Sequence, residues 1–244
     1  PLRLVGSEMC IRDRACTNRS TSSEQDEVRH WNNVLQQINA LLLENKAQQT
    51  LDLAKQTLPE ILESAEKNGT TDTLIYYARK IFNACGNNYI NTKQYKDGID
   101  YMDSIGNHPL IREHCPHELL SFKAGLNQLY GNNPEAVRLA EDYLQLPVCT
   151  SANDFIRQAE IISGVYMYSG NNLPKAIQIL EKAIDVYRKG GNFPNMLRIM
   201  SRLGIYYHLS GEYEKAIATN QEAIATYNDS IAPVSYTHLR AHET

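Results

Sequence analysis

Apolar residues recur along most of the chain at the spacing of amphipathic helices. From Val28 onward they stand at positions i, i+3, i+4 and i+7, and Gly, Asn or Pro interrupts the pattern about every 15–20 residues. No stretch alternates apolar and polar residues for long enough to predict a strand. The short interruptions predict antiparallel hairpins, so the pattern indicates an all-α fold. It predicts about ten helices, at residues 28–44, 47–67, 70–91, 94–106, 116–130, 134–146, 151–169, 173–189, 194–209 and 213–228.

A short motif recurs at the junctions between helices. In three copies a Gly ends one helix, a polar turn follows, and a small residue stands early in the next helix; a fourth copy shares only the small residue. Such a Gly suits a left-handed helix end, and a small residue is needed where two helices of a hairpin cross closely. The motif therefore predicts a stack of repeated hairpins. The Gly residues are Gly131, Gly170 and Gly211, and the small residues are Gly98, Ala136, Ala176 and Ala216, spaced by 38, 40 and 40.

This repetition resembles the tetratricopeptide repeat family. Asn220 departs from the family pattern, which usually has an aromatic or large apolar residue there, and residues 28–67 are placed by helical period alone. The resemblance implies a right-handed α-solenoid of about five hairpins, whose first helices line a concave groove that binds proteins or peptides. The period is longer than the family's usual repeat of about 34 residues, which predicts longer helices. The last copy is the best match, at Leu203, Gly204, Tyr207, Gly211, Tyr213, Ala216 and Ala223.

One candidate part of this groove is polar and lies on the predicted helix 70–91. Lys80, Asn83, Asn87 and Asn91 are spaced by three, four and four residues, which places them on one helical face. Because Asn amides both donate and accept hydrogen bonds, this face is suited to holding an extended peptide backbone. The alternative is a solvated polar face without a ligand.

A second candidate part is basic and lies on the last hairpins. Arg198 and Arg202 are four residues apart, so that they can hold one carboxylate together. This pair resembles the basic half of the clamp with which some family members bind C-terminal carboxylates, but Ser121, Gly125 and Ile161 occupy the places of the other half. The alternative is that these Arg side chains pair with Glu or Asp of the chain itself. The candidates of this part are Arg157, Arg198, Arg202 and His208.

Aromatic residues supply a third kind of candidate. Phe122 is predicted to face the groove, and Tyr168 and Tyr206 are further candidates. Aromatic side chains in helices also pack between elements, and most of the 15 Tyr residues are better explained in that way.

Composition and charge restrict the function further. The chain has 244 residues and a formal net charge of −4, which argues against a general nucleic-acid binder. No apolar run reaches the roughly 18 residues of a membrane span. Phosphate-binding glycine loops, metalloprotease motifs, nucleophile elbows and Cys-x-x-Cys pairs are absent from the sequence. We therefore expect a protein without catalytic activity or cofactor.

One stretch concentrates reactive side chains, namely His108, His114, Cys115 and His117 near Pro109 and Pro116. Zinc uses Cys and His ligands, but this spacing is not usual for a zinc site. We expect a polar loop between repeats and no metal, with a zinc-dependent enzyme as the alternative.

The two ends of the sequence do not continue the repeat pattern. Codons exist for which residues 4–13 are encoded by the strand opposite to residues 234–243. We interpret residues 1–14 and 234–244 as translated inverted adapter DNA of a sequencing library and exclude them from the fold. Residues 15–27 are polar and predict a flexible linker, which leaves residues 28–233 as the repeat domain.

Cys16 precedes a run of small polar residues, an arrangement that resembles the acylated site of a bacterial lipoprotein. This favours a periplasmic or otherwise exported location, with membrane contact only through a lipid anchor or a missing segment. We expect the interaction or sensor module of a larger bacterial signalling protein. The alternative is a free-standing exported lipoprotein that assembles or carries envelope proteins.

Overall fold

The computed structural model describes residues 22–147, 152–190 and 193–228. Within these ranges it contains eleven helices and no strand, which confirms the all-α prediction. Apart from the start of the first helix, the ends of the ten predicted helices agree with the structure within two residues. The helices are α2 (Ser22–Leu43), α3 (Ala47–Asn68), α4 (Asp72–Asn91), α5 (Tyr95–Ile105), α6 (Pro109–His114), α7 (Pro116–Tyr130), α8 (Asn133–Gln145), α9 (Ala152–Tyr168), α10 (Leu173–Gly190), α11 (Phe193–Leu209) and α12 (Tyr213–Thr226).

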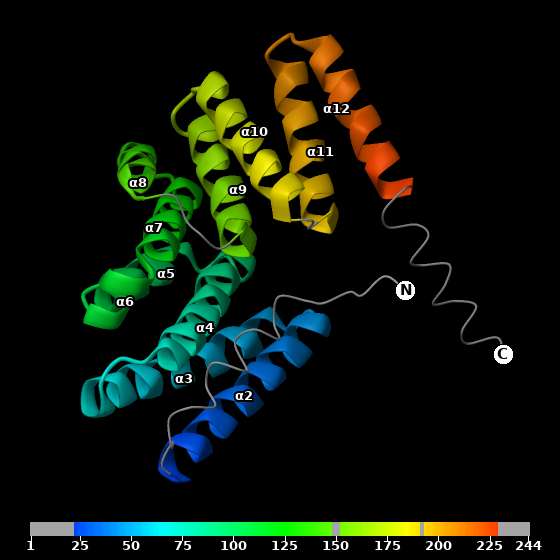
Figure 1. Cartoon of the computed structure of the whole chain (residues 1–244). Coiled ribbons are helices and arrows are strands. Elements are labelled where there is room, and N and C mark those ends of the chain that lie inside the picture. The colour runs from blue at the N-terminus through cyan, green and yellow to red at the C-terminus, as the bar shows by residue number, and fades with distance from the viewer. Residues whose placement is uncertain (1–21, 148–151, 191–192, 229–244) are drawn as a thin grey trace, which may run out of the picture.

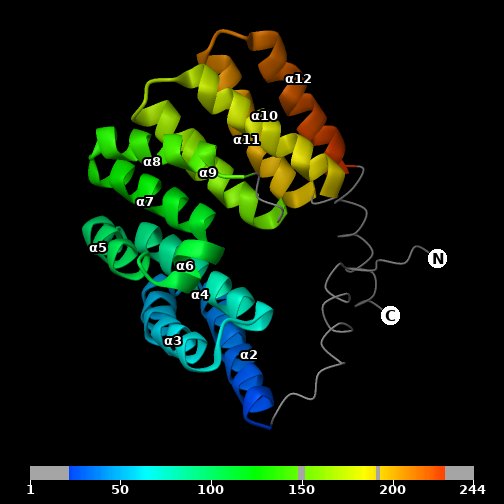
Figure 2. The same cartoon turned by 60° about the vertical axis from the view of Figure 1, so that its left-hand side comes forward.

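Five antiparallel hairpins stack in chain order, from α2–α3 at one end to α11–α12 at the other (Figure 1). Each first helix packs on the first helix of the preceding hairpin, in the order α2, α4, α7, α9 and α11. It also packs on the preceding second helix, as α4 does on α3 and α11 on α10. Figure 2 shows the same succession of layers from another side. The structure is the predicted α-solenoid, in which each hairpin contacts its neighbours.

A residue in the left-handed region follows each of the five first helices. Gly131 and Gly211, with φ of 96° and 81°, take the conformation that the sequence predicts for them. Asn45 and Lys93 take the same place after α2 and α4. The prediction for Gly170 is wrong, because the extra residue of that turn moves the positive φ to Asn171.

The small residues early in the second helices are buried, as their spacing predicts. Ala136 and Ala176 are completely enclosed where the helices of their hairpins cross. At Gly98 a Cβ atom would lie 3.0 Å from Tyr89 and 3.1 Å from Leu126, so that only a very small residue fits. Two apolar clusters run through the stack, one from α2 to α7 and one from α7 to α12.

The connection between α5 and α7 differs from the predicted polar loop. It contains α6, which packs on α4 and α7 and buries Leu110 and Ile111. Pro109 occupies the first turn of α6, and the His108 ring accepts a hydrogen bond from the Leu110 amide at 3.2 Å. Two adjacent apolar residues suffice to fix this short helix, although they are too few to form a helical period.

Helix α2 begins at Ser22, whereas the sequence predicts a linker over residues 15–27 and a helix from Val28. The linker prediction is therefore wrong for residues 22–27, and residues 15–21 lie outside the described part of the chain. The Glu27 carboxylate accepts hydrogen bonds from Ser64, at 3.0 Å, and from Asn68 of α3. The contact of Glu27 with α3 thus stabilises the start of α2, where the sequence lacks the apolar periodicity of a helix.

None of the helices in the described part of the chain combines the length and the apolar character that crossing a bilayer requires.

Candidate functional site

The polar face of α4 is present in the structure. Lys80, Asn83 and Asn87 are half-buried and Asn91 is exposed. The Lys80 ammonium lies 5.7 Å from the centre of the Tyr76 ring, and the Asn91 amide donates to the Asn88 side chain at 3.5 Å. These side chains present one cation and several amides on the face of a first helix. They remain a candidate site for a peptide backbone.

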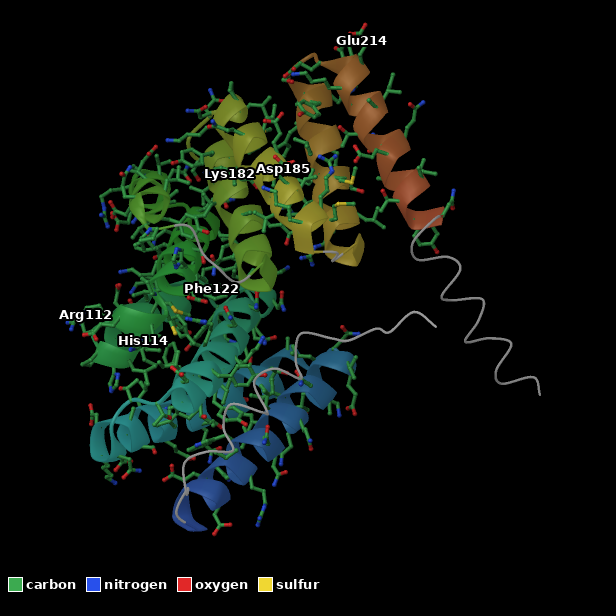
Figure 3. All side chains as sticks on the ribbon, viewed as in Figure 1. Arg112, His114, Phe122, Lys182, Asp185 and Glu214 are labelled. Carbon is green, nitrogen blue, oxygen red and sulfur yellow. The ribbon has the colours of Figure 1, made fainter. Side chains whose placement is uncertain are left out.

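Phe122 does not face the groove, which corrects the sequence prediction. Its side chain is 1% exposed and lies between α4 and α7, where it packs edge-to-face on Phe82 with ring centres 6.2 Å apart (Figure 3). The ring fills the space that Gly86 leaves open on α4. Tyr206 is buried as well, whereas Tyr168 is 69% exposed. Phe122 and Tyr206 are therefore core residues, and only Tyr168 is available to a ligand.

Arg198 and Arg202 hold a carboxylate residue together, but it belongs to the chain itself. The Arg198 Nε atom lies 2.9 Å from the carboxylate of Glu160 on α9, and Arg202 donates to the Glu160 backbone carbonyl at 3.0 Å. Glu160 is buried. The predicted anion-binding pair is thus engaged within the stack, in agreement with the alternative of internal ion pairs.

A similar contact joins α4 to α7. The Arg79 Nε atom lies 3.2 Å from the carboxylate of buried Glu118, and its guanidinium also donates to the His114 carbonyl at 2.6 Å. Glu118 stands 42 residues before Glu160. Each buried Glu therefore joins its first helix to an Arg of a neighbouring first helix. Sequence analysis overlooked these Glu residues, because their Arg partners lie on neighbouring first helices, 39 and 38 residues away in the sequence.

Replacing Glu160 by Gln is expected to lower the free energy of unfolding by about 1–2 kcal/mol, because the buried charge-assisted contact to Arg198 is lost. Chemical denaturation followed by circular dichroism measures the change. Glu222→Gln is the matched control, since its pair with Arg188 is about half exposed on both sides and is expected to contribute less than about 0.5 kcal/mol. Equal effects of the two substitutions would contradict the structural role of Glu160.

The remaining basic candidates contribute less. Arg157 lies in α9, but its side chain is outside the described residues. His208 is exposed near the end of α11, and its ring contacts the Tyr213 ring at a centre-to-centre distance of 5.2 Å. His208 therefore lies at the junction of the last hairpin and not beside the α4 face.

The first helices expose an apolar row that sequence analysis did not identify as such. Leu129, Tyr168 and Leu209 stand two residues before Gly131, Gly170 and Gly211, at the ends of α7, α9 and α11. Their exposed fractions are 41%, 69% and 54%. Asn91 occupies the corresponding position of α4, two residues before Lys93. We call Leu129, Tyr168 and Leu209 the apolar row. Their shared position two residues before the turn is the sequence signal from which the row could have been predicted.

The His and Cys residues around α6 do not converge. His108 contacts Glu66, the His117 ring lies 2.7 Å from the Pro147 carbonyl oxygen, and Cys115 is buried between α6 and α7. His114 and Arg112 lie on α6 at the outer edge of the stack (Figure 3). Among the residues that the structure describes, no group of three or more His, Cys, Asp or Glu side chains is placed to hold a metal ion.

Cys85 is a packing residue with no sign of reactivity. Burial raises the pKa of its thiol to about 12, although the Tyr101 hydroxyl, 3.8 Å from the sulfur, acts in the opposite direction. The other Cys of interest, Cys16, is the candidate lipidation site and lies outside the described residues, as do residues 1–14 and 234–244.

The stacked hairpins and their shared register define a helical repeat scaffold of the tetratricopeptide type. The family model described as "Tetratricopeptide repeat" matches residues 159–229, from α9 to just past α12. These residues carry tetratricopeptide repeats, and the hairpins before them have the same architecture. The described chain therefore has a tetratricopeptide-like solenoid fold, as its sequence resemblance implies, and the family itself is matched over residues 159–229.

The comparison with solved structures supports this fold through the first of the two described next. The nearly identical TPR-like repeats of a kinesin light chain from Podosopora anserina share 12% identity with the chain at a TM-score of 0.52, covering 82% of this chain and 95% of that one. MamA 41-end from Desulfovibrio magneticus RS-1 shares 14% identity at a TM-score of 0.49, with 85% and 98% covered. None of the curated proteins compared with the chain matches it. The similarity to the kinesin light chain repeats concerns the fold alone.

Proposed function

We propose that the chain is a non-catalytic scaffold that binds a protein or peptide along the face of its first helices. Its fold is that of a tetratricopeptide repeat scaffold, similar to modules of protein interaction. Stacked repeats of this kind offer extended surfaces to their partners.

The observation that carries this proposal is the apolar row. Leu129, Tyr168 and Leu209 come from three successive first helices and share one position in the repeat, so that each added hairpin adds one exposed apolar side chain to the same edge. Scattered exposed apolar residues are normal on a surface, but a repeated position indicates a contact surface. The partner that fits is a peptide with apolar side chains that contact the row and a backbone that the α4 amides hold.

Replacing the three residues of the apolar row together by Ser is expected to weaken peptide binding at least tenfold. Tenfold corresponds to about 1.4 kcal/mol, less than the burial of three such side chains contributes. Peptides are first selected on the unmodified chain from a random phage library, and their affinities for both forms are then measured by fluorescence anisotropy.

The matched control is Leu144→Ser on α8, a second helix, where the side chain is similarly exposed but lies outside the row. This variant is expected to bind the selected peptides as the unmodified chain does, with the same circular dichroism spectrum. Full binding by the triple Ser variant would refute the assignment of the row. If only Asn83→Ala and Asn87→Ala reduced binding, the ligand surface would be the α4 face alone.

In its fuller form, the proposal places this scaffold in a larger bacterial signalling protein as the interaction or sensor module. The support is analogy at the level of the fold. Sequencing the gene through both ends tests it. A downstream membrane helix followed by a kinase or DNA-binding domain is the expected result. A lipoprotein signal before Cys16 and a stop codon soon after residue 233 would instead favour the exported lipoprotein.

A further inference from the structure

The position that the apolar row occupies exists in all five first helices. It is the place just before the turn of each hairpin, and we call its five residues the row positions. Leu43 of α2 is the most exposed of the apolar ones, at 86%, and Asn91 of α4 is exposed as well. Along the stack the row positions therefore read apolar, polar, apolar, apolar, apolar. They are Leu43, Asn91, Leu129, Tyr168 and Leu209.

The turns that follow the row positions lie against one another. Gln94, in the turn after α4, donates to the Gln48 side chain at the start of α3 at 2.6 Å. Ser169, next to Tyr168, donates to the Asn133 side chain at the start of α8 at 2.8 Å. Successive first helices pack on one another, and packed helices stand about 8–10 Å apart. The row positions thus form one edge of the stack, with a step of that size.

This step selects the backbone conformation of a ligand. In a polyproline II helix every third side chain points the same way, about 9 Å further along. A β-strand repeats its side chains about every 7 Å and so loses register within two hairpins. An α-helix regains one direction after about 10 Å, but its backbone groups are bonded internally and are not available to the α4 amides. The polyproline II backbone has no internal hydrogen bonds, so its carbonyls can accept from these amides.

The surroundings of the row positions suit such a ligand in two further ways. Tyr130 and Tyr168 are 54% and 69% exposed at the ends of consecutive first helices, and exposed aromatic side chains are the usual contact surface of Pro-rich segments. The adjoining turns are mostly uncharged, and in the first of them Glu44 pairs with Lys46 at 2.6 Å. Asn, Ser, Thr, Gln and Gly make up most of residues 92–94, 131–133, 169–172 and 210–212. The edge therefore fits an uncharged segment that contains Pro.

We infer that the ligand of the apolar row is a peptide segment in the polyproline II conformation with an apolar side chain at every third residue, an assignment that rests on the proposed function. The ligand carries a polar side chain opposite Asn91, because an amide that is covered by a ligand needs hydrogen-bonding partners. Its motif consists of five triplets, in which four apolar side chains are interrupted by one polar side chain at the second place from one end.

A labelled peptide of five Leu-Pro-Pro triplets is the probe, with Gln replacing Leu in the second triplet or, for the opposite direction of binding, in the fourth. One of the two forms is expected to bind the whole chain at least tenfold more tightly than a peptide of the same composition in which Leu recurs at every second residue. Replacing every Pro of the probe by Gly is expected to weaken binding at least tenfold, because a flexible chain must be ordered on binding. Fluorescence anisotropy measures these affinities.

Leu43→Ser tests whether the row positions act as one register. The substitution is expected to weaken binding of the five-triplet probe at least threefold. It leaves unchanged the binding of a peptide of three Leu-Pro-Pro triplets, which spans only α7, α9 and α11. The control is Leu42→Ser, since Leu42 is also exposed but points about 100° away around the same helix. This control is expected to change neither affinity by more than twofold, and circular dichroism checks the fold of both variants.

Asn91→Leu gives a change in the opposite direction. A probe with Leu in all five triplets is expected to bind this variant several-fold more tightly than it binds the unmodified chain, and the preference for Gln disappears. Equal weakening of both probes would indicate a structural effect on α4 and would contradict the place of Asn91 in the register.

Two results would overturn the polyproline II ligand and leave the proposed function standing. One is equal binding of the probe and its rearranged control. The other is that peptides selected from the phage library depend on the apolar row but repeat their apolar side chains at strand or helix spacing. Full binding of the selected peptides by the triple Ser variant would instead refute both proposals.

Other occupants of the row positions give different results. A concentration-dependent dimer in sedimentation experiments that the triple Ser variant abolishes would assign the edge to a second copy. Probe binding that appears only after residues 1–21 or 229–244 are deleted would assign it to the chain's own ends. Either result would overturn the assignment to a separate ligand.

Discussion

Replacing Phe122 by Ala is expected to lower the free energy of unfolding by about 3–5 kcal/mol, the usual cost of removing a buried ring. The ring is 1% exposed and contacts both Phe82 and the Gly86 backbone, so that its loss leaves a cavity between α4 and α7. Chemical denaturation measures the change. Phe122→Leu, which refills part of the cavity, is expected to cost less than half as much.

The same experiment decides between two roles of Phe122. If Phe122 were a groove residue, its replacement by Ala would reduce the peptide affinity and leave the free energy of unfolding nearly unchanged. A loss of stability below about 1 kcal/mol, together with a loss of binding, would return Phe122 to the candidate groove residues and contradict its place in the core.

Replacing Gly86 by Ala is expected to destabilise the fold by about 2–3 kcal/mol, the upper part of the range of about 1–3 kcal/mol for inserting a methyl group into a filled core. The added Cβ would lie 2.4 Å from two atoms of the Phe122 ring and 2.6 Å from a third. The Phe122 ring is held between two helices and cannot move away without displacing α7. The cost of this clash exceeds the gain in helix propensity from Gly to Ala.

Gly164 is the matched control, since it is also a buried glycine in a first helix. A Cβ there would meet only the Gln128 side chain, at 3.8 Å. Gly164→Ala is therefore expected to stabilise the fold, by up to about 1 kcal/mol, through the lower entropy of the unfolded chain. Thermal denaturation of both variants in parallel gives the comparison, and a change of the same sign at both sites would contradict the packing described here.

Most helices could be predicted from the sequence because their signals are local. An apolar stripe at helical spacing and a turn residue such as Gly131 or Gly211 act within a few residues, and the structure confirms them. Helix α6 escaped prediction because Leu110 and Ile111 are too few to form a period. The start of α2 escaped because Glu27 finds its partners on α3, far away in the sequence.

The candidate site could be predicted only in part, for the same reason. The α4 face depends on spacing within one helix, and its residues share that face in the structure. The prediction for Phe122 failed because the direction of a ring depends on the glycine that faces it from another repeat. The contacts of Arg198 and Arg202 could not be predicted, because their partner Glu160 lies on the preceding first helix, 38 residues earlier than Arg198; its carboxylate contacts Arg198 and its backbone carbonyl contacts Arg202.

By itself, then, the sequence determined the elements and their repetition: amphipathic helices, turns and small residues at the crossings, and from these a solenoid of tetratricopeptide type. Only the tertiary structure decided which side chains a neighbouring hairpin covers. It buried Phe122, engaged Arg198 and left the apolar row exposed. The physical reason is that helical period and turn conformation arise from interactions within a few residues. Burial, in contrast, is set by contacts between hairpins about 40 residues apart.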